Sequence, residues 1–263
     1  MREFSADYLR RTREGMWESR DALADLELDS RERVLDVGCG TGELARVLAD
    51  ETPGDVFGTD ADPRLLSVAR EFVPCVAGDA YRLPFPDDSF DLVVCQALLI
   101  NLPEPVRAVR EFARVSSDLV AAIEPDNAAV SVESTVPEER SLSRTAREAY
   151  VAGTATDITL GGEGTRELFR TAGLHDSSTH PHHHAKTVEP PYSERDIEAA
   201  KRKATASALT DRRDTLVGPL STDEYDDLRA EWREMGRETI RQMGGEEYRR
   251  AEVVPFYVTT ARV

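Results

Sequence analysis

Apolar and polar positions follow two different periods along the first half of the chain. Short apolar runs bounded by turn residues predict buried strands over 34–37, 55–59, 74–77, 90–95 and 119–124. Apolar residues at helical spacing predict helices over 43–50, 63–72 and 104–115. Strands that alternate with short helices favour a Rossmann-like, doubly wound α/β fold with a parallel sheet.

The flanking segments follow less regular patterns. An amphipathic pattern predicts one helix over 6–26, and two more helices are expected over 138–150 and 165–172. We expect an exposed strand over the polar segment 175–188 and the last strand of the chain over 256–261.

A charged helical pattern fills the segment between these last two strands. It runs over 193–250 and is interrupted by Gly218-Pro219 and Gly244-Gly245. We therefore expect a single domain over 1–263, with a core at about 30–190 and 251–263 and a helical insertion at 191–250. The insertion is interpreted either as a lid over a ligand or as a solvated helical pair or dimer contact.

The charge balance narrows the classes of partner. Asp and Glu total 50 against 33 Lys and Arg, so the formal net charge is -17. This charge would repel a polyphosphate backbone, which disfavours a nucleic-acid substrate. An acidic surface also suits concentrated salt, where self-repulsion is screened, so we hypothesise a halophilic host.

The chain gives no sign of a membrane span or an export signal. No apolar run approaches the length of a membrane span, and the first residues do not resemble a signal peptide, so we expect a cytoplasmic protein. Cys39, Cys75 and Cys95 are far apart in the sequence and odd in number. We therefore expect all three to be buried, reduced thiols. Their spacing fits neither a disulfide framework nor a zinc site.

The stretch VLDVGCGTGELA, residues 34–45, joins a strand to a helix through a glycine-rich loop. Gly38, Gly40 and Gly42 have the spacing of a loop that approaches a nucleotide cofactor. A dinucleotide fingerprint needs its third small residue one place later, where this chain has Glu43. The glycines by themselves leave the cofactor class open.

Carboxylates at three strand ends separate the alternatives. Asp36, just before the loop, would repel a pyrophosphate and attract an ammonium group. Asp60 ends the second strand, where it could accept both hydroxyls of a ribose, and Asp79 follows the third, where it could accept from an adenine amine. An ammonium, a ribose and an adenine without phosphate describe S-adenosylmethionine.

Three successive segments of the chain resemble the cofactor motifs of class I S-adenosylmethionine-dependent methyltransferases, in particular those of methyltransferase type 11. They are VLDVGCGTGELA, VFGTDADPRLL and VAGDAYRLPFPDDSFDLVVCQALLINLPEP, and the similarity covers about residues 33–125. The resemblance implies a seven-stranded sheet with an antiparallel last strand, which suits 256–261.

The resemblance also implies a set of cofactor-binding residues. Family members often cover the cofactor with an N-terminal helix, which makes Arg13 a candidate for the methionine carboxylate. Asp62 also suits a helix cap, and Cys39 is interpreted as a small residue without a nearby base. The implied set is Asp36 at the methionine amine; Gly38, Cys39, Gly40 and Gly42 at the methionine and ribose; Asp60, Ala61 and Asp62 at the ribose; Asp79 and Ala80 at the adenine; and Gln96, Ala97 and Leu98 near the sulfonium.

The catalytic groups are less defined, because a sulfonium donor is already reactive and positioning supplies much of the acceleration. Glu124 and Asn127 follow the fifth strand at the edge where open α/β sheets bind ligands. Either could orient or deprotonate an acceptor, or simply form a polar turn. The chain has no histidine pair after its fourth strand and no Asn/Asp-Pro-Pro-Tyr signature of nucleic-acid amino methyltransferases.

His180, His182 and His184 would share one face of an extended chain, which is a metal-ligand spacing. Pro181 and the polar neighbours favour a solvated edge strand, so we expect no bound metal. The sequence therefore predicts an S-adenosylmethionine-dependent methyltransferase for a small-molecule acceptor, with a homodimer compatible with its amphipathic helices. The alternatives are an RNA or protein methyltransferase, or an S-adenosylmethionine-binding protein without transfer activity.

Overall fold

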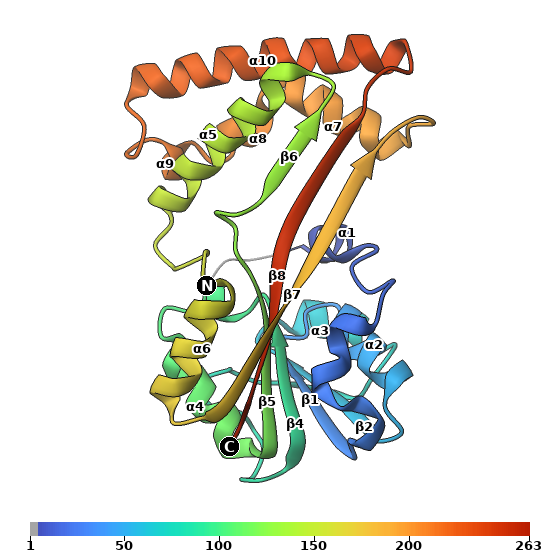
Figure 1. The fold of residues 1–263 in the computed structure, drawn as a ribbon, viewed down its shortest axis with the longest axis vertical. Coiled ribbons are helices and arrows are strands. Elements are labelled where there is room, and N and C mark those ends of the chain that lie inside the picture. Colours follow the sequence, from blue (N-terminus) through green and yellow to red (C-terminus); the bar gives the residue numbers. More distant parts are fainter. Residues whose placement is uncertain (1–4) are drawn as a thin grey trace. The chain divides into compact units, whose positions relative to one another are not determined.

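The structure is a computed structural model that describes residues 5–263 (Figure 1). The chain forms two compact units. The first comprises the residues up to Asp126 together with Leu160–His182 and Pro255–Val263, and the second comprises Asn127–Thr159 and His183–Val254. Two long strands, β7 (His175–Val188) and β8 (Arg250–Arg262), contribute residues to both units.

The first unit is built on a sheet whose central strands are parallel. The strand order is β3-β2-β1-β4-β5-β8, and β7 also pairs with β8. Strand β8 runs antiparallel to β5, beside which it lies in Figure 1. Within the described residues the sheet has eight strands, one more than the expected seven, because β6 (Ser131–Ser134) also pairs with β8. The predicted α/β fold class with an antiparallel last strand is confirmed. The parallel strands are β1 (Arg33–Val37), β2 (Asp55–Asp60), β3 (Cys75–Ala77), β4 (Phe90–Gln96) and β5 (Ser116–Pro125).

Helices follow these strands as the apolar spacing predicted. The hydrophobic core beside α4 and α6 includes Phe90, Phe112 and Phe169, each at most 1% exposed. Asp62 and Pro63 begin α3 as expected, and α3 ends at Ala69 rather than at 72. The helices are α2 (Glu43–Glu51), α3 (Pro63–Ala69), the 3-10 turn η3 (Leu99–Asn101), α4 (Pro105–Val115) and α6 (Gly161–Ala172).

The expected single helix over 6–26 is wrong. Helix α1 covers only Ala6–Arg13, and the chain then turns at Gly15, whose φ of +73° lies in the left-handed region that favours glycine. Two 3-10 turns follow, η1 (Asp21–Leu26) and η2 (Leu28–Ser30). Helical spacing alone missed the break because Met16 and Trp17, both buried, fit the periodicity of a continuous helix.

The second unit contains five helices and a short strand pair within the described residues. Strand β6 was not predicted from the sequence, because it has only four residues and pairs with the first part of β8. Tyr225 and Tyr248 are fully buried in its core. Its elements are β6 (Ser131–Ser134), α5 (Pro137–Gly153), α7 (Glu194–Thr205), α8 (Ser207–Thr210), α9 (Arg213–Leu216) and α10 (Thr222–Gly244).

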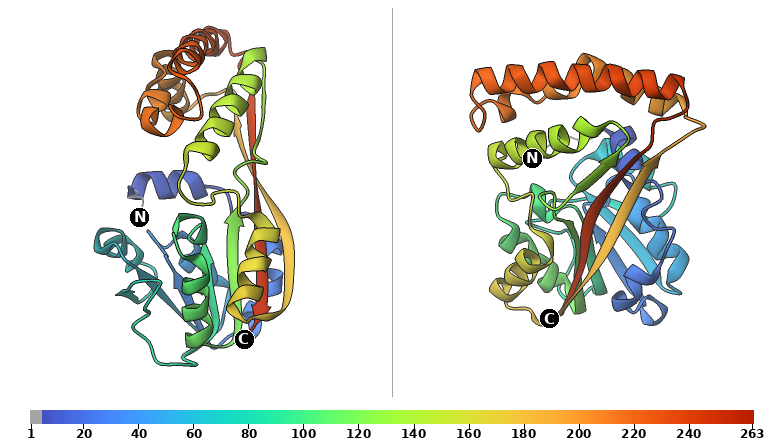
Figure 2. Two further views of the ribbon diagram at one scale, coloured as in Figure 1. Left: turned by 90° about the vertical axis from the view of Figure 1, so that its left-hand side faces the viewer. Right: turned by 45° about the horizontal axis from the view of Figure 1, so that its top comes forward.

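Helices α7 and α10 lie side by side in the second unit (Figure 2). A Cβ atom on Gly236 would stand 2.2 Å from the backbone nitrogen of Ala204, so only glycine permits this approach. The unit also includes 127–159, which lies outside the segment 191–250 that we expected as the insertion.

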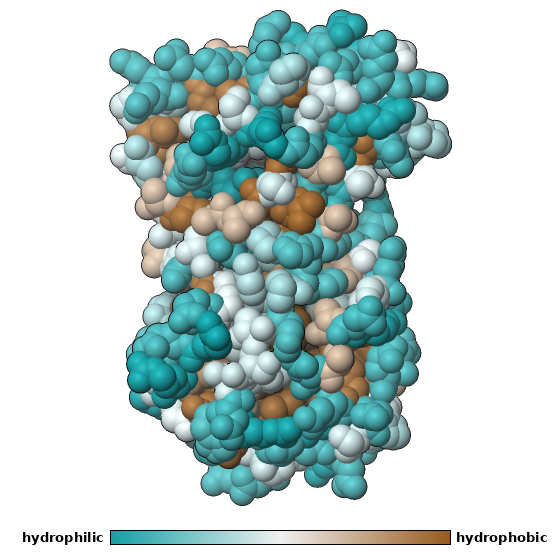
Figure 3. Space-filling model, viewed as in Figure 1, coloured by the Kyte–Doolittle hydropathy of each residue, from teal (hydrophilic) through white to brown (hydrophobic). Residues whose placement is uncertain are grey.

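The face of the molecule shown in Figure 3 is mainly hydrophilic, with smaller apolar areas. This agrees with the large share of charged residues, 32% of the sequence. No helix among residues 5–263 is both long and apolar enough to pass through a bilayer.

Candidate cofactor site

The glycine loop after β1 is held against β2 by its own backbone. The N–H groups of Gly38 and Cys39 both donate to the carbonyl of Thr59, at 2.7 and 3.1 Å. Gly38, Gly40 and Gly42 all have positive φ, between +55° and +85°. A Cβ on Gly38 would stand 2.9 Å from Cδ1 of Leu98, so side chains are excluded here by both space and backbone conformation.

Asp60, at the end of β2, closes this loop. Its Oδ2 accepts from the N–H of Gly40 at 2.9 Å, and its Oδ1 accepts from the N–H of Asp62 at 2.8 Å. A carboxylate has about four lone-pair sites, so both oxygens can still accept from ligand hydroxyls. Asp62 itself caps α3 and pairs with Arg64, which is the helix-cap alternative expected for it.

Asp36 is the least satisfied polar group of this region. It is 1% exposed, and neither carboxylate oxygen meets the distance and angle of a hydrogen bond with any described residue; the Ala45 N–H interacts with it only weakly and lowers its pKa slightly. Burial raises the pKa of Asp36 to about 8; the Arg13 guanidinium lowers it in part, and the Asp60 carboxylate raises it further. A buried carboxylate without a partner is costly, and the ammonium of an amino-acid ligand is a group that would satisfy it.

The N-terminal segment lies over the loop. Cδ1 of Leu9 is 2.8 Å from the point where a Cβ on Gly40 would stand. Burial lowers the pKa of the Arg13 guanidinium, while the carboxylates of Glu43 and Asp36 oppose this shift. The charges of Arg13 and Asp36 therefore interact with each other. Leu9 and Thr59 were missed in the sequence, because contacts of this kind carry no local pattern.

The residues after β4 complete the same edge of the sheet. Gln96 is 5% exposed, its Nε2 lies 2.8 Å from Sδ of Met16, and its Oε1 has no hydrogen-bond partner among the described residues. Ala97 has a positive φ of 49°, and its N–H donates to the carbonyl of Ile123. This turn directs Leu98 towards Gly38, so two of the predicted segments meet.

Asp79 and Ala80 follow β3 next to the end of β2. The N–H of Gly78 donates to the Asp60 carbonyl at 3.1 Å, which ties this turn to the ribose candidate. Asp79 is exposed, and its Oδ1 accepts from the N–H of Tyr81 at 2.9 Å. Ala80 is buried in the core.

Glu124, one of the two candidate catalytic residues, supports the turn after β4. It is fully buried, and its carboxylate accepts from the N–H groups of Leu98 and Leu99 at 3.0 and 2.8 Å. Burial raises the pKa of Glu124 to about 7, although these backbone hydrogen bonds lower it. Glu124 is thus a positioning residue for the turn after β4. Asn127 belongs to the second unit, where its Nδ2 donates to the carbonyl of Ile158 at 2.6 Å.

The histidines of β7 contact other parts of their own units. His180 pairs with Asp25, and His182 lies 2.9 Å from the Met16 carbonyl and stacks on Trp17 with a centroid distance of 5.3 Å. His184 is buried in the second unit. Across residues 5–263, no cluster of three or more histidine, cysteine or acidic side chains has the arrangement of a metal site.

Two cysteines that we expected to be unrelated are neighbours. Sγ of Cys39 and Sγ of Cys75 both lie about 3 Å from the point where a Cβ on Gly58 would stand, at 2.9 and 3.0 Å. Cys75 is only partly buried, which corrects the expectation of a buried thiol there. Distance along the sequence did not predict this contact. In the strand order β3-β2-β1, the strand that carries Cys75 and the strand that precedes Cys39 flank the same strand β2, so both side chains reach Gly58.

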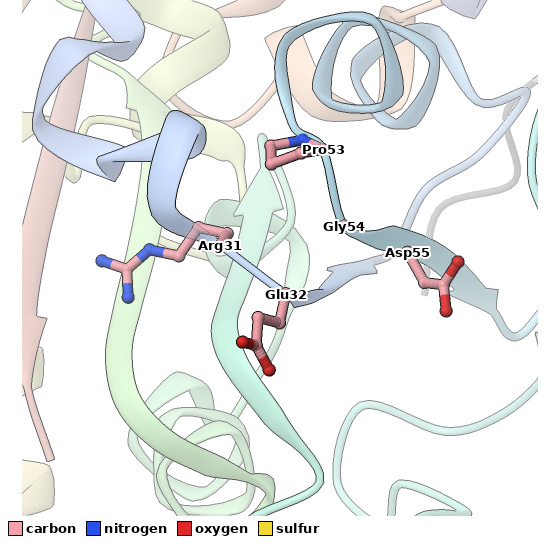
Figure 4. Close-up of a pocket in the computed structure, with 5 residues that line it drawn as sticks. All are labelled: Arg31, Glu32, Pro53, Gly54 and Asp55. Atoms are coloured by element: carbon pink, nitrogen blue, oxygen red, sulfur yellow. The ribbon is translucent and has the colours of Figure 1, made fainter.

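A separate pocket lies at the opposite edge of the sheet (Figure 4). Its lining residues Arg31, Glu32, Pro53, Gly54 and Asp55 precede or begin β1 and β2. Ligands of open α/β sheets bind at the carboxyl ends of the strands, so this pocket is not part of the loop site.

Comparisons with known proteins place the glycine-loop segment in a family. Residues 35–118 match the model of a family described as methyltransferase domain. A demethylmenaquinone methyltransferase of Lactiplantibacillus plantarum is 33% identical over 131 residues, which cover 46% of this chain and 52% of that protein. Methyltransferase GfsG of Streptomyces halstedii is 36% identical over 34% of this chain and 36% of its own length. The chain thus spans about half the length, or less, of these curated relatives.

Solved structures agree on the fold. A Bacillus halodurans protein described as a methyltransferase has a TM-score of 0.52 at 18% identity, with 93% of this chain and 99% of that chain covered. A Thermotoga maritima S-adenosylmethionine-dependent methyltransferase has a TM-score of 0.50 at 21% identity, with 72% and 84% covered. At such identities the likeness shows the fold. Residues 35–118 of this chain therefore match a methyltransferase domain, and the predicted resemblance to class I S-adenosylmethionine-dependent methyltransferases is confirmed.

Proposed function

We propose that the chain binds S-adenosylmethionine and transfers its methyl group to a small-molecule acceptor. The observation that carries the proposal is the buried Asp36 carboxylate, which has no hydrogen-bond partner among the described residues and lies beside a loop of three positive-φ glycines. An ammonium group satisfies such a carboxylate, and a phosphate would be repelled by it. The family match of residues 35–118 supports the same cofactor.

The residues of this site divide the work of holding the cofactor. Asp36 would bind the methionine amine, Asp60 the ribose hydroxyls, and Asp79 with Ala80 the adenine. When bound, S-adenosylmethionine supplies an electrophilic methyl group on a sulfonium. Glu124 fixes the turn after β4 through Leu98 and Leu99, so Gln96 to Leu98 keep one conformation beside the loop. Orientation of this kind is a main source of acceleration for an intrinsically reactive donor.

The acceptor class rests on charge and on relatives. A net charge of -17 disfavours an RNA acceptor at ordinary salt. The Lactiplantibacillus plantarum relative is named for a quinone acceptor. A lid role for 191–250, a homodimer, a cytoplasmic location and a halophilic host belong to the same proposal, supported by the sequence patterns above.

Calorimetric titration with S-adenosylmethionine tests the cofactor assignment. The variant Asp60→Ala should lose binding, since it removes the acceptor for the loop N–H and for the ribose together. Asp55→Ala is the matched control, because Asp55 is an exposed carboxylate at the opposite end of the same strand. Full affinity in Asp60→Ala would contradict the proposed pose.

A second experiment addresses transfer. Incubation with a metabolite extract and isotopically labelled S-adenosylmethionine should yield a small molecule that gains one labelled methyl group. Tight cofactor binding with no labelled product from metabolites, RNA or protein would instead support the alternative of a binding protein without transfer activity.

Arg13→Ala tests the N-terminal segment. Because Arg13 is half-buried and its charge interacts with the carboxylates of Glu43 and Asp36, its loss should weaken S-adenosylmethionine binding by about tenfold, or ~1.4 kcal/mol. Arg10→Ala on the exposed face of α1 is the control. Equal affinities in both variants would remove Arg13 from the site.

A further inference from the structure

A pair of thiols converges on one glycine in the middle of the first unit. Gly58 in β2 pairs with Asp36 of β1 on one side and with Cys75 of β3 on the other. Because Gly58 has no side chain, Cys39 from the glycine loop and Cys75 from β3 extend into the same space above it. Their Sγ atoms lie 2.9 and 3.0 Å from the position of the missing Cβ.

The two thiols differ in environment. Cys75 is partly exposed, and its Sγ lies 3.3 Å from the carbonyl of Val73. The neighbouring Cys39 thiol and the charge of Arg70 lower the pKa of Cys75, while burial raises it in part. Cys39 is buried against Leu66 and Ala69, and both the neighbouring Cys75 sulfur and burial raise its pKa. An accessible thiol of lowered pKa beside a buried second thiol is typical of a redox-sensitive pair.

We propose that Cys39 and Cys75 form an oxidisable dithiol that a hydroperoxide converts into a disulfide. The Cys75 thiolate attacks one peroxide oxygen, which breaks the O–O bond and gives a sulfenic acid and hydroxide. The Cys39 sulfur then attacks the Cys75 sulfur, forms the S–S bond and releases water, while its proton goes to the departing oxygen. Both sulfurs are oxidised, and hydrogen peroxide is reduced to two molecules of water.

The disulfide should weaken cofactor binding, an effect that rests on the proposed function. Cys39 lies between Gly38 and Gly40, and its N–H is one of the two that hold the loop to Thr59. An S–S bond of about 2.05 Å requires the two side chains to move together. Because Cys39 is part of the loop itself, the movement displaces the backbone that would contact the cofactor. We expect the affinity for S-adenosylmethionine to fall by about tenfold, equivalent to ~1.4 kcal/mol.

The test uses the full-length protein, reduced and then exposed to hydrogen peroxide in slight excess. Peptide mapping by mass spectrometry should show Cys39 and Cys75 peptides linked, with two hydrogen atoms lost and with reversal by dithiothreitol. Cys75→Ser should remove the link and the loss of affinity while the reduced variant binds S-adenosylmethionine like the wild type. Cys95→Ala is the matched control, because Cys95 is fully buried against Glu124 and away from the pair.

The outcomes separate the two proposals. Peptides of Cys39 and Cys75 that stay unlinked under peroxide, or that become singly oxidised only, would overturn the dithiol. A linked protein that keeps its full affinity would overturn the effect on the loop. Failure of the reduced protein to bind S-adenosylmethionine would count against the proposed function, and the mass measurement would still decide the dithiol.

Discussion

The pH dependence of cofactor binding follows from the buried carboxylate of Asp36. Its pKa is about 8, so the free protein carries mainly the neutral acid at pH 7. Only the ionised form balances the charge of an ammonium group. Binding of S-adenosylmethionine should therefore release a proton at neutral pH, and its affinity should rise as the pH increases.

The size of the effect follows from the same pKa. At pH 6, two units below the pKa, about one molecule in 100 has Asp36 ionised, which costs ~2.7 kcal/mol of binding free energy relative to the ionised form. The affinity should rise about tenfold per pH unit and reach its maximum near pH 8. Above that pH the gain ends, because an α-amino group with a pKa of about 8 loses its own proton.

Calorimetric titrations from pH 6 to 9 at constant ionic strength measure this dependence, and buffers of different ionisation enthalpy count the released protons. Asp36→Asn should bind weakly and without the slope below pH 8. The variant should also remain folded. Because its pKa is raised, wild-type Asp36 contributes fully to the free energy of unfolding below pH 4, and this contribution is lost as the pH rises through about 8. Asparagine does not ionise, so the variant avoids this loss. A flat affinity between pH 6 and 8, or the same slope in Asp36→Asn, would refute the reasoning.

Three further predictions concern stability and the loop. Glu124→Ala should lower the free energy of unfolding in urea by at least ~3 kcal/mol, because the buried N–H groups of Leu98 and Leu99 lose their acceptor. At pH 8, Glu124→Gln should lower the free energy of unfolding by less than Glu124→Ala does. At this pH the stability that wild-type Glu124 contributes through its raised pKa of about 7 is already lost, and equal losses in both variants would contradict this. Gly40→Ala should cost ~1–2 kcal/mol in stability and also weaken cofactor binding, whereas Gly173→Ala, at φ +100° with no neighbour within 4 Å, should affect stability only. Finally, the unfolding free energy should increase when KCl is raised from about 0.01 M to 1 M, because the net charge of -17 is screened; a decrease would argue against a halophilic host.

Local sequence determined the order of elements and most of the candidate site. The glycine loop, Asp36 and Asp60 could be placed together because the carboxyl ends of parallel strands meet at one edge of a sheet. Periodicity located the strands 33–37 and 55–60 within one residue. It failed at Gly15, where one residue with positive φ ended a helix whose apolar spacing continued.

Tertiary structure decided everything that depends on which groups become neighbours. The sequence showed a carboxylate at 36 and another at 124. It could not show that Asp36 is buried without a hydrogen-bond partner among residues 5–263, or that Glu124 accepts hydrogen bonds from the turn at Leu98 and Leu99. It gave no sign that Cys39 and Cys75 meet above Gly58. Burial and hydrogen-bond partners arise from residues far apart in the chain, so no local pattern encodes them, and these contacts determine whether a carboxylate binds a ligand or supports the fold.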